Sequence, residues 1–112
     1  MEIHFSSNKL AKQLSESRTM EKTHGLQRAR ILKVIMASLR AAANLGDFAP
    51  PYSPPHRCHE LIGNRKGQFS LDLEWPYRLL FKSIGQYDST TGTQGWYAIT
   101  AIKVIGVKDT HE

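Results

Sequence analysis

The spacing of hydrophobic residues predicts a short strand and two helices in the first 46 residues. Residues 2–5 alternate between polar and apolar side chains, and Ser6 and Ser7 behind them are typical of a helix N-cap. A thin apolar stripe predicts a first helix from residue 8 to about Gly25. A stronger stripe predicts a second helix over residues 26–46. Its apolar face is expected to carry Leu32, Ile35, Leu39 and Ala42.

The pattern changes to strands after a proline-rich segment. Residues 47–57 hold four of the five prolines, which predicts an extended loop that joins no helix and no central strand. Strict alternation then predicts a strand over residues 68–75, with Phe69, Leu71, Leu73 and Trp75 facing inward. Pro76 marks a turn, and residues 77–84 form the partner strand.

The end of the chain completes a sheet. Residues 85–96 are polar and rich in Gly and Thr, so we expect a long mobile hairpin loop. Residues 97–107 are apolar on both faces, which predicts a strand in the middle of the sheet. The order of elements predicts an α+β fold: an antiparallel sheet with two N-terminal helices packed on one face.

Composition adds a basic surface to this picture. With 112 residues, we expect one domain spanning residues 1–112. The net charge is +5, with +4 in residues 1–50, +2 in residues 51–84 and −1 in the remainder. Such a protein attracts polyanions, most commonly nucleic acid, although Arg30, Lys33 and Arg40 on the second helix also fit an ordinary solvated face.

The same composition bears on the compartment. Cys58 is the only cysteine, which excludes an internal disulfide and suits a reducing cytoplasm. The N-terminus lacks the pattern of a signal peptide, and no apolar run has the length of a membrane span. We therefore expect a soluble, cytoplasmic protein with no membrane contact.

Several polar residues are not explained by the core: His59, Arg65, Lys66, Arg78, Asp109 and His111. Cations, a carboxylate and two histidines suit the cleavage of RNA. In that reaction a base takes the proton of the 2′-OH, a cation stabilises the charge on the phosphate, and an acid protonates the leaving 5′-oxygen. His56, Cys58 and His59 do not have the spacing of a zinc site, so we expect neither a metal nor another cofactor.

The order of these motifs resembles the HigB branch of the RelE/ParE toxin superfamily of bacterial type II toxin–antitoxin systems. The similarity covers about residues 56–111 and rests on His59 to Gly67, Phe69-Ser70, Tyr77 to Phe81 and Asp109-Thr110-His111. It implies a microbial-ribonuclease-like fold and a metal-independent endoribonuclease that cuts mRNA in the ribosomal A site. It also implies a helix-turn-helix, HigA-like antitoxin as partner, in a toxin–antitoxin hetero-oligomer.

The resemblance assigns roles to individual residues. The catalytic histidine of the family falls on His59 and the phosphate-stabilising arginine on Arg78; the acidic residue and histidine near the C-terminus fall on Asp109 and His111. Arg65 and Lys66 are expected to contact the RNA backbone. Two positions depart from the family pattern. Ile62 stands where the family has a catalytic lysine, and Thr110 where it has a tyrosine.

These departures keep other interpretations open. One is a ParE-like inhibitor of DNA gyrase; another is a catalytically inactive partner or killer-suppression protein. Arg78 is also placed to pair with Asp72 or Glu74 across the hairpin. Near the polar loop, Trp96 and Tyr97 are the candidates for stacking on a base.

Overall fold

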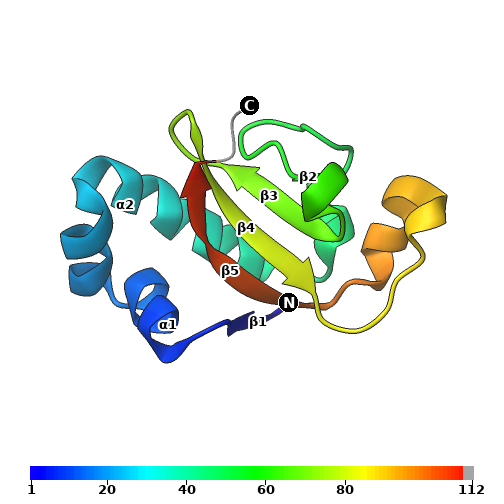
Figure 1. Cartoon of the computed structure of the whole chain (residues 1–112). Helices are drawn as coiled ribbons and strands as arrows, with labels where there is room; N and C mark the ends of the chain where they lie inside the picture. The colour runs from blue at the N-terminus through cyan, green and yellow to red at the C-terminus, as the bar shows by residue number, and fades with distance from the viewer. Residues whose placement is uncertain (110–112) are drawn as a thin grey trace.

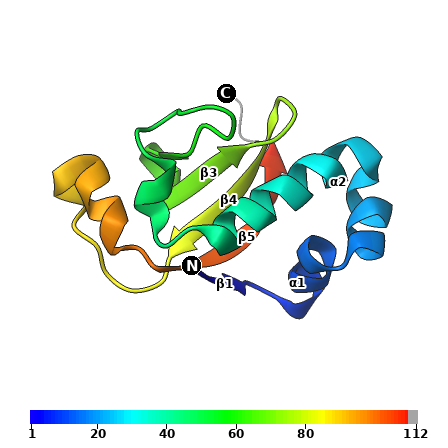
Figure 2. The same ribbon diagram turned by 180° about the vertical axis from the view of Figure 1, so that it is seen from behind.

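The computed structural model describes residues 1–109 and has the expected α+β architecture (Figure 1). Five strands form one sheet, and one face of this sheet is covered by the long second helix (Figure 2). No helix in the described part of the chain is long and apolar enough to span a membrane. In chain order the elements are β1 Glu2–Phe5, α1 Asn8–Ser15, α2 Ser17–Ala41, 3₁₀ helix η1 Leu45–Phe48, β2 His59–Glu60, 3₁₀ helix η2 Gly63–Arg65, β3 Gln68–Asp72, β4 Tyr77–Ser83, 3₁₀ helix η3 Ser89–Ala98 and β5 Ala101–Asp109.

The sheet is mixed rather than purely antiparallel. Its strand order is β1-β5-β4-β3-β2, and all neighbours are antiparallel except β1 and β5. The parallel pair arises because the chain leaves β1, passes through both helices and the remaining strands, and returns in β5 beside its own beginning. As predicted, β5 lies inside the sheet, flanked by β1 and β4.

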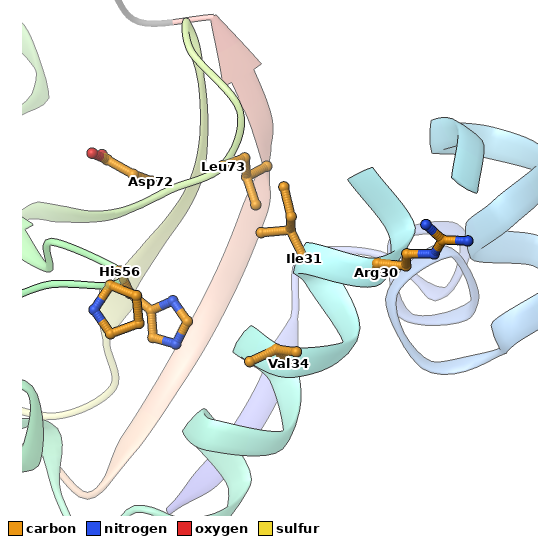
Figure 3. Close-up of a pocket in the computed structure, with 7 residues that line it drawn as sticks. Arg30, Ile31, Val34, His56, Asp72 and Leu73 are labelled. Carbon is orange, nitrogen blue, oxygen red and sulfur yellow. The ribbon is translucent and has the colours of Figure 1, made fainter. Parts of the chain in front are cut away.

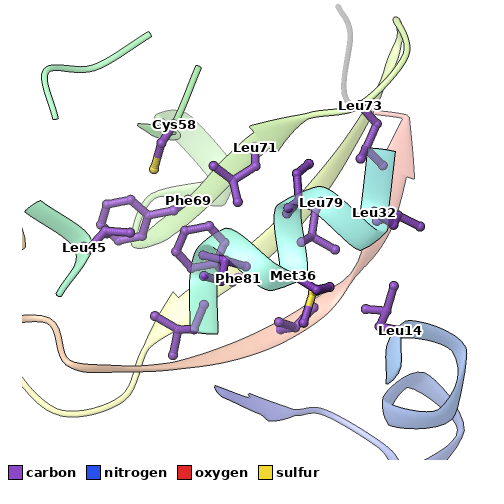
Figure 4. Close-up of a cluster of buried hydrophobic side chains, with 14 of the residues drawn as sticks. Leu14, Leu32, Met36, Leu45, Cys58, Phe69, Leu71, Leu73, Leu79 and Phe81 are labelled. Carbon is purple, nitrogen blue, oxygen red and sulfur yellow. The ribbon is translucent and has the colours of Figure 1, made fainter. Parts of the chain in front are cut away.

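The core lies between α2 and the covered face of the sheet (Figure 4). The predicted apolar face of the second helix is confirmed, since Leu32, Ile35 and Leu39 are fully buried. Phe69 and Phe81 stack across β3 and β4 with ring centroids 5.5 Å apart. Each such side chain contributes about 1.5–3 kcal/mol by leaving water.

The helical region has one more break than predicted. The break at Gly25 is confirmed, because this residue has φ 80° and ψ 165° inside α2, a conformation that favours glycine. An additional break lies at Glu16, whose extended backbone separates α1 from α2. The polar sequence around Glu16 gives no turn signal, and the break allows α1 to fold back on α2 and bury Leu14.

The two tryptophans differ from the prediction. Trp75 is 77% exposed because β3 ends at Asp72, so the alternation does not continue into the turn before β4. Trp96 is only 3% exposed and packs edge-on against Phe69, with ring centroids 5.6 Å apart. The segment expected to be a mobile loop therefore consists largely of the 3₁₀ helix η3, which packs against the core through Trp96. Because Trp96 is buried there, it is not available for stacking on a base.

Candidate nucleic-acid interface

The face of the sheet opposite α2 carries the residues of functional interest, and we call it the open face. In a strand, alternate side chains point to the same side, so the register shows which residues share it. Three rows cross the strands here: Gln68, Lys82, Lys103 and His4; His59, Ser70, Leu80 and Gly106; and Asp72, Arg78 and Lys108.

The outer rows make the open face basic. Arg78, Lys82, Lys103 and Lys108 come from β4 and β5, and Arg57 reaches Asp72 from the proline-rich loop. The described carboxylates on these rows are Asp72 and, at the β1 edge, Glu2 beside His4. Five cations against two carboxylates leave a positive surface, which favours an anionic partner.

Arg78 lies within this basic surface but does not stand alone. Its Nε is 3.4 Å from Asp72 Oδ1, directly across the β3–β4 hairpin, so the expected alternative of a cross-strand ion pair is confirmed. Asp72 is shared, because Arg57 Nε lies 3.7 Å from its other oxygen. One carboxylate thus orients two guanidinium groups, and their summed charge still exceeds its own.

Lys108 is the immediate neighbour of Arg78 on β5. Its Cε lies 3.6 Å from the position that a Cβ on Gly106 would occupy, so the lysine side chain runs back over the glycine. Gly106 pairs with Leu80, which in turn pairs with Ser70. The ammonium group of Lys108 is therefore carried toward the middle row of the open face.

His59 begins β2 and is only 6% exposed. Its Nδ1 lies 2.9 Å from the carbonyl oxygen of Arg57, which can only accept, so in the neutral ring Nδ1 carries the proton. Nε2 is then the acceptor and faces the Ser70 hydroxyl at 3.4 Å. In this tautomer, Nε2 is the nitrogen able to take up a proton.

Tyr52 covers His59. The two rings are stacked with centroids 4.2 Å apart, and the Arg57 guanidinium lies over the tyrosine ring at 5.2 Å from its centroid. Tyr52 and Arg57 are the only described non-glycine residues with positive φ, at 66° and 53°. Such strained backbone is found preferentially at functional sites. A hollow of about 210 Å³ opens beside the pair, lined also by Thr93 and Trp96.

The other expected site residues are not gathered with Arg78. Asp109 pairs in register with Tyr77, whose ring packs toward the core, so Asp109 falls on the helix-covered side of the sheet, opposite Arg78. His111 lies outside the described residues. Arg65 ends η2 and Lys66 follows it, and both are exposed. Ile62, which precedes η2, is 89% exposed. The roles predicted for these residues remain predictions.

Sequence reasoning missed four residues of this surface: Tyr52, Lys82, Lys103 and Lys108. Alternation in β4 places Lys82 on the face of Arg78, and this signal was present in the sequence. Lys103 and Lys108 are five residues apart in β5, so alternation alone would put them on opposite faces; the register shift opposite Leu80 and Phe81 brings both onto the open face. Tyr52 carries no such signal, because its contact with His59 depends on the path of the proline-rich loop.

The thiol of Cys58, next to His59, is unreactive, and the described residues hold no cluster of metal ligands. Burial raises the pKa of the Cys58 thiol to about 12, which keeps it protonated at neutral pH. Within residues 1–109, no three His, Cys, Asp or Glu side chains gather as metal ligands.

Comparison with known proteins identifies the fold. No protein-family model matches the chain, and no curated protein does. Among solved structures, a mutant of YafQ from E. coli is similar with a TM-score of 0.55, at 16% identity, over 97% of this chain and 92% of that chain. A YoeB/ParE toxin from Agrobacterium tumefaciens has a TM-score of 0.48 at 16% identity, over 99% and 100% of the two chains. The chain therefore has the fold of YafQ, as the resemblance to RelE/ParE toxins predicted.

Proposed function

We propose that this protein is the toxin of a type II toxin–antitoxin system and a metal-independent, ribosome-dependent mRNA endoribonuclease. The observation that carries the proposal is the basic open face, on which Arg78 and Lys108 lie side by side in one row and His59 begins the next. The YafQ-like fold and the sequence resemblance to HigB-type toxins support the same assignment.

The proposed reaction needs three contributions. The 2′-oxygen bonds to the adjacent phosphorus while the bond from phosphorus to the 5′-oxygen breaks. His59 Nε2 accepts the proton of the 2′-OH, the Arg78 guanidinium binds the phosphate oxygens in a planar fork, and the leaving oxygen takes a proton from an acid. We assign this last role to His111, following the sequence resemblance.

Lys108 is proposed to replace the lysine that the family has at position 62. Ile62 can donate no hydrogen bond, but Lys108 neighbours Arg78 directly and its side chain crosses Gly106. A second cation beside Arg78 would stabilise the negative charge that builds on the phosphate in the transition state. In the family, this role belongs to the lysine that Ile62 replaces here. Tyr52 then has to move off His59 when RNA binds, since the ring covers it.

A second candidate function is RNA binding without cleavage. It is favoured by the burial of His59 beneath Tyr52 and by the pairing of Arg78 with Asp72. In this case the basic open face would hold RNA, but no base would reach the 2′-OH.

Expression in growing bacteria tests the proposal. Induction of the protein should stop growth and produce mRNA ends inside codons, whereas the Arg78→Ala variant should do neither. Arg18→Ala is the matched control, because it removes the same charge from an exposed position on α2. Growth arrest with DNA damage and intact mRNA would instead indicate gyrase inhibition. Arrest that persists in Arg78→Ala would overturn the assigned site.

A further inference from the structure

The hollow of about 210 Å³ beside Tyr52 and His59 lies next to β2, the strand at this edge of the sheet. The proline-rich loop lines it with Pro51 and Tyr52, and η3 lines it with Thr93 and Trp96. One water molecule occupies about 30 Å³ in the liquid, so the hollow is large enough for a flat ring system. The loop and η3 thus form the walls of a small cavity beside His59.

Glu60 also lines the hollow, and within residues 1–109 its carboxylate forms no ion pair. The Tyr87 hydroxyl hydrogen-bonds to this carboxylate; burial, and after it the carboxylate, raises the pKa of Tyr87 to about 12. A carboxylate has two oxygens with about four acceptor sites, so most of this capacity stays available. Such a group repels a phosphate and accepts hydrogen bonds from N–H donors.

The larger groove between α2 and the proline-rich loop differs in this respect (Figure 3). Its volume is about 580 Å³, and the carboxylate at its edge belongs to Asp72. Arg57 and Arg78 both pair with Asp72, so the charge of this carboxylate is neutralised. An uncharged ligand with N–H donors therefore finds an available acceptor at Glu60 rather than at Asp72.

The backbone of Glu60 adds a donor on the outer side of β2. The amide of Leu61 donates to the carbonyl of Gln68 at 2.8 Å, and His59 is opposite Ser70 in the register. Hydrogen-bonded pairs alternate along an antiparallel ladder, so the N–H and C=O of the residue between them point away from β3. The same residue thus offers a carboxylate and an outward N–H group at the edge of the sheet.

Guanine matches these groups better than the other bases do. Its Watson–Crick edge carries two adjacent donors, N1–H and the N2 amino group, beside the acceptor O6. A carboxylate accepts both donors in parallel, and a backbone N–H can donate to O6. Adenine has an unprotonated N1 where guanine has N1–H, and this nitrogen repels a carboxylate. Cytosine and uracil each present a single donor group on this edge.

We propose that the hollow binds the base next to the scissile phosphate and selects guanine, with Glu60 as the specificity-determining residue. The inference rests on the proposed function for the identity of RNA as the ligand. His59 lines the same hollow, so a base bound there has its phosphate directed toward the basic open face. Tyr52, which covers His59 in the free protein, stacks on the bound base and thereby uncovers the histidine.

The experiment measures binding to short 2′-O-methyl oligonucleotides that carry one guanine, adenine or cytosine in a uracil background. These probes have no 2′-OH to attack the phosphate, so the measurement does not depend on cleavage. Fluorescence anisotropy at low salt should show at least tenfold tighter binding of the guanine probe by wild-type protein. Glu60→Gln should abolish this preference, because its amide has one acceptor oxygen and turns an N–H toward a guanine donor.

Two further variants serve as controls for the base preference. Glu2→Gln makes the same chemical change in β1, at the opposite edge of the sheet, and should keep the preference for guanine. Tyr52→Ala should weaken all probes about fivefold or more to a similar extent, since stacking is tolerant of sequence. Circular dichroism and thermal unfolding should show that each variant is folded like the wild type.

The outcomes separate this inference from the proposed function. Equal affinities of wild-type protein for all probes, or no measurable binding, would overturn the guanine site. A folded Glu60→Gln variant that still prefers guanine would overturn the role of Glu60. If wild-type protein prefers guanine through Glu60 but cuts no mRNA, the site stands and the nuclease assignment fails. If mRNA is cut regardless of guanine and the probes bind equally, the nuclease stands and this inference fails.

Discussion

At the scale of single residues, the central feature is the pair of Arg78 and Lys108 on neighbouring strands. The register sets them opposite each other, where side chains lie about 5 Å apart at Cβ. The charged ends of these two side chains repel each other unless an anion lies between them or a carboxylate neutralises one. Asp72 partly neutralises Arg78 in the free protein, and a phosphate would do so for both.

Replacing Lys108 tests its proposed role. In Lys108→Ala, we expect the rate of mRNA cleavage at saturating ribosome concentration to fall by about 10²–10³, the usual cost of losing one transition-state donor. Lys103→Ala, on the same strand and face, should weaken binding but leave this saturated rate intact. Single-turnover cleavage of a defined message measures both. Equal rates in Lys108→Ala and wild type would exclude the role.

The burial of His59 gives a second prediction at this scale. Diethylpyrocarbonate, followed by mass spectrometry, should modify His59 far more slowly than the exposed His4. Tyr52→Ala removes the stacked ring and should speed modification of His59 about tenfold or more. Tyr97→Ala, which removes another exposed ring, should have no such effect. If His59 and His4 of the wild type react equally fast, Tyr52 is not a cover.

At the scale of elements, a charged cluster joins α2 to the turn between β3 and β4. Arg28 Nε and Nη2 donate to Glu74 at 2.7–3.0 Å, and the guanidinium lies over the Tyr77 ring at 3.9 Å from its centroid. Such a fork holds the turn against the helix and sets the start of β4, where Arg78 follows Tyr77.

This cluster makes stability depend on pH. The hydrogen bonds from Arg28 lower the pKa of Glu74, so its contribution is present above the ordinary carboxyl pKa and is lost as the pH falls through the lowered value. Glu74→Gln should reduce the unfolding free energy at pH 7 by about 1–2 kcal/mol, and the gap to wild type should close as the pH falls through the lowered pKa of Glu74. Urea titrations of both proteins at a series of pH values measure this difference in unfolding free energy. Glu2→Gln, at an exposed pair, should cost much less. A gap that persists in acid would contradict this account.

The elements also show what the sequence could and could not predict. Period-two alternation in β4 predicts which of its residues share a face, and the apolar stripe predicts the buried side of α2. The end of β3 is not predictable in this way, because it depends on a hydrogen bond from Asp72 to the carbonyl of His56 in the loop. Likewise, the burial of Trp96 is not predictable from its polar neighbours in the sequence, because it depends on the packing of Trp96 against Phe69.

The candidate site follows the same division. Arg78 and His59 were found through short motifs, and the structure places both on the open face. Asp109 was expected near Arg78, but strand alternation at the end of β5 puts it on the other side. That outcome depends on the bulge between Leu80 and Phe81, which shifts the register of β4 against β5 and leaves no local sequence signal.

At the scale of the whole molecule, the fold separates two surfaces. The open face is basic and faces away from α2, whereas the other face of the sheet is covered by this helix. The proposed RNA is thus assigned to the open face, and the net charge of +5 favours such an anionic partner.

Charge on the open face predicts a salt-dependent affinity. The dissociation constant for a single-stranded RNA oligonucleotide should rise steeply with salt, and each of Lys82→Ala and Lys103→Ala should reduce the slope of log K against log salt by up to about 0.7. Lys9→Ala on α1 should leave the slope unchanged. Fluorescence anisotropy of a labelled oligonucleotide at several salt concentrations measures these dissociation constants. Slopes that respond equally to all three substitutions would place the RNA elsewhere.

The most direct measurement maps new 5′ ends on a defined message incubated with purified protein and a translation extract, with and without ribosomes. The account predicts cuts inside codons only when ribosomes are present, their loss in Arg78→Ala, and their persistence in Arg18→Ala. Cuts without ribosomes, or cuts that survive Arg78→Ala in folded protein, would contradict it. The absence of cuts by folded wild-type protein would contradict the nuclease and leave the basic open face as a binding surface alone.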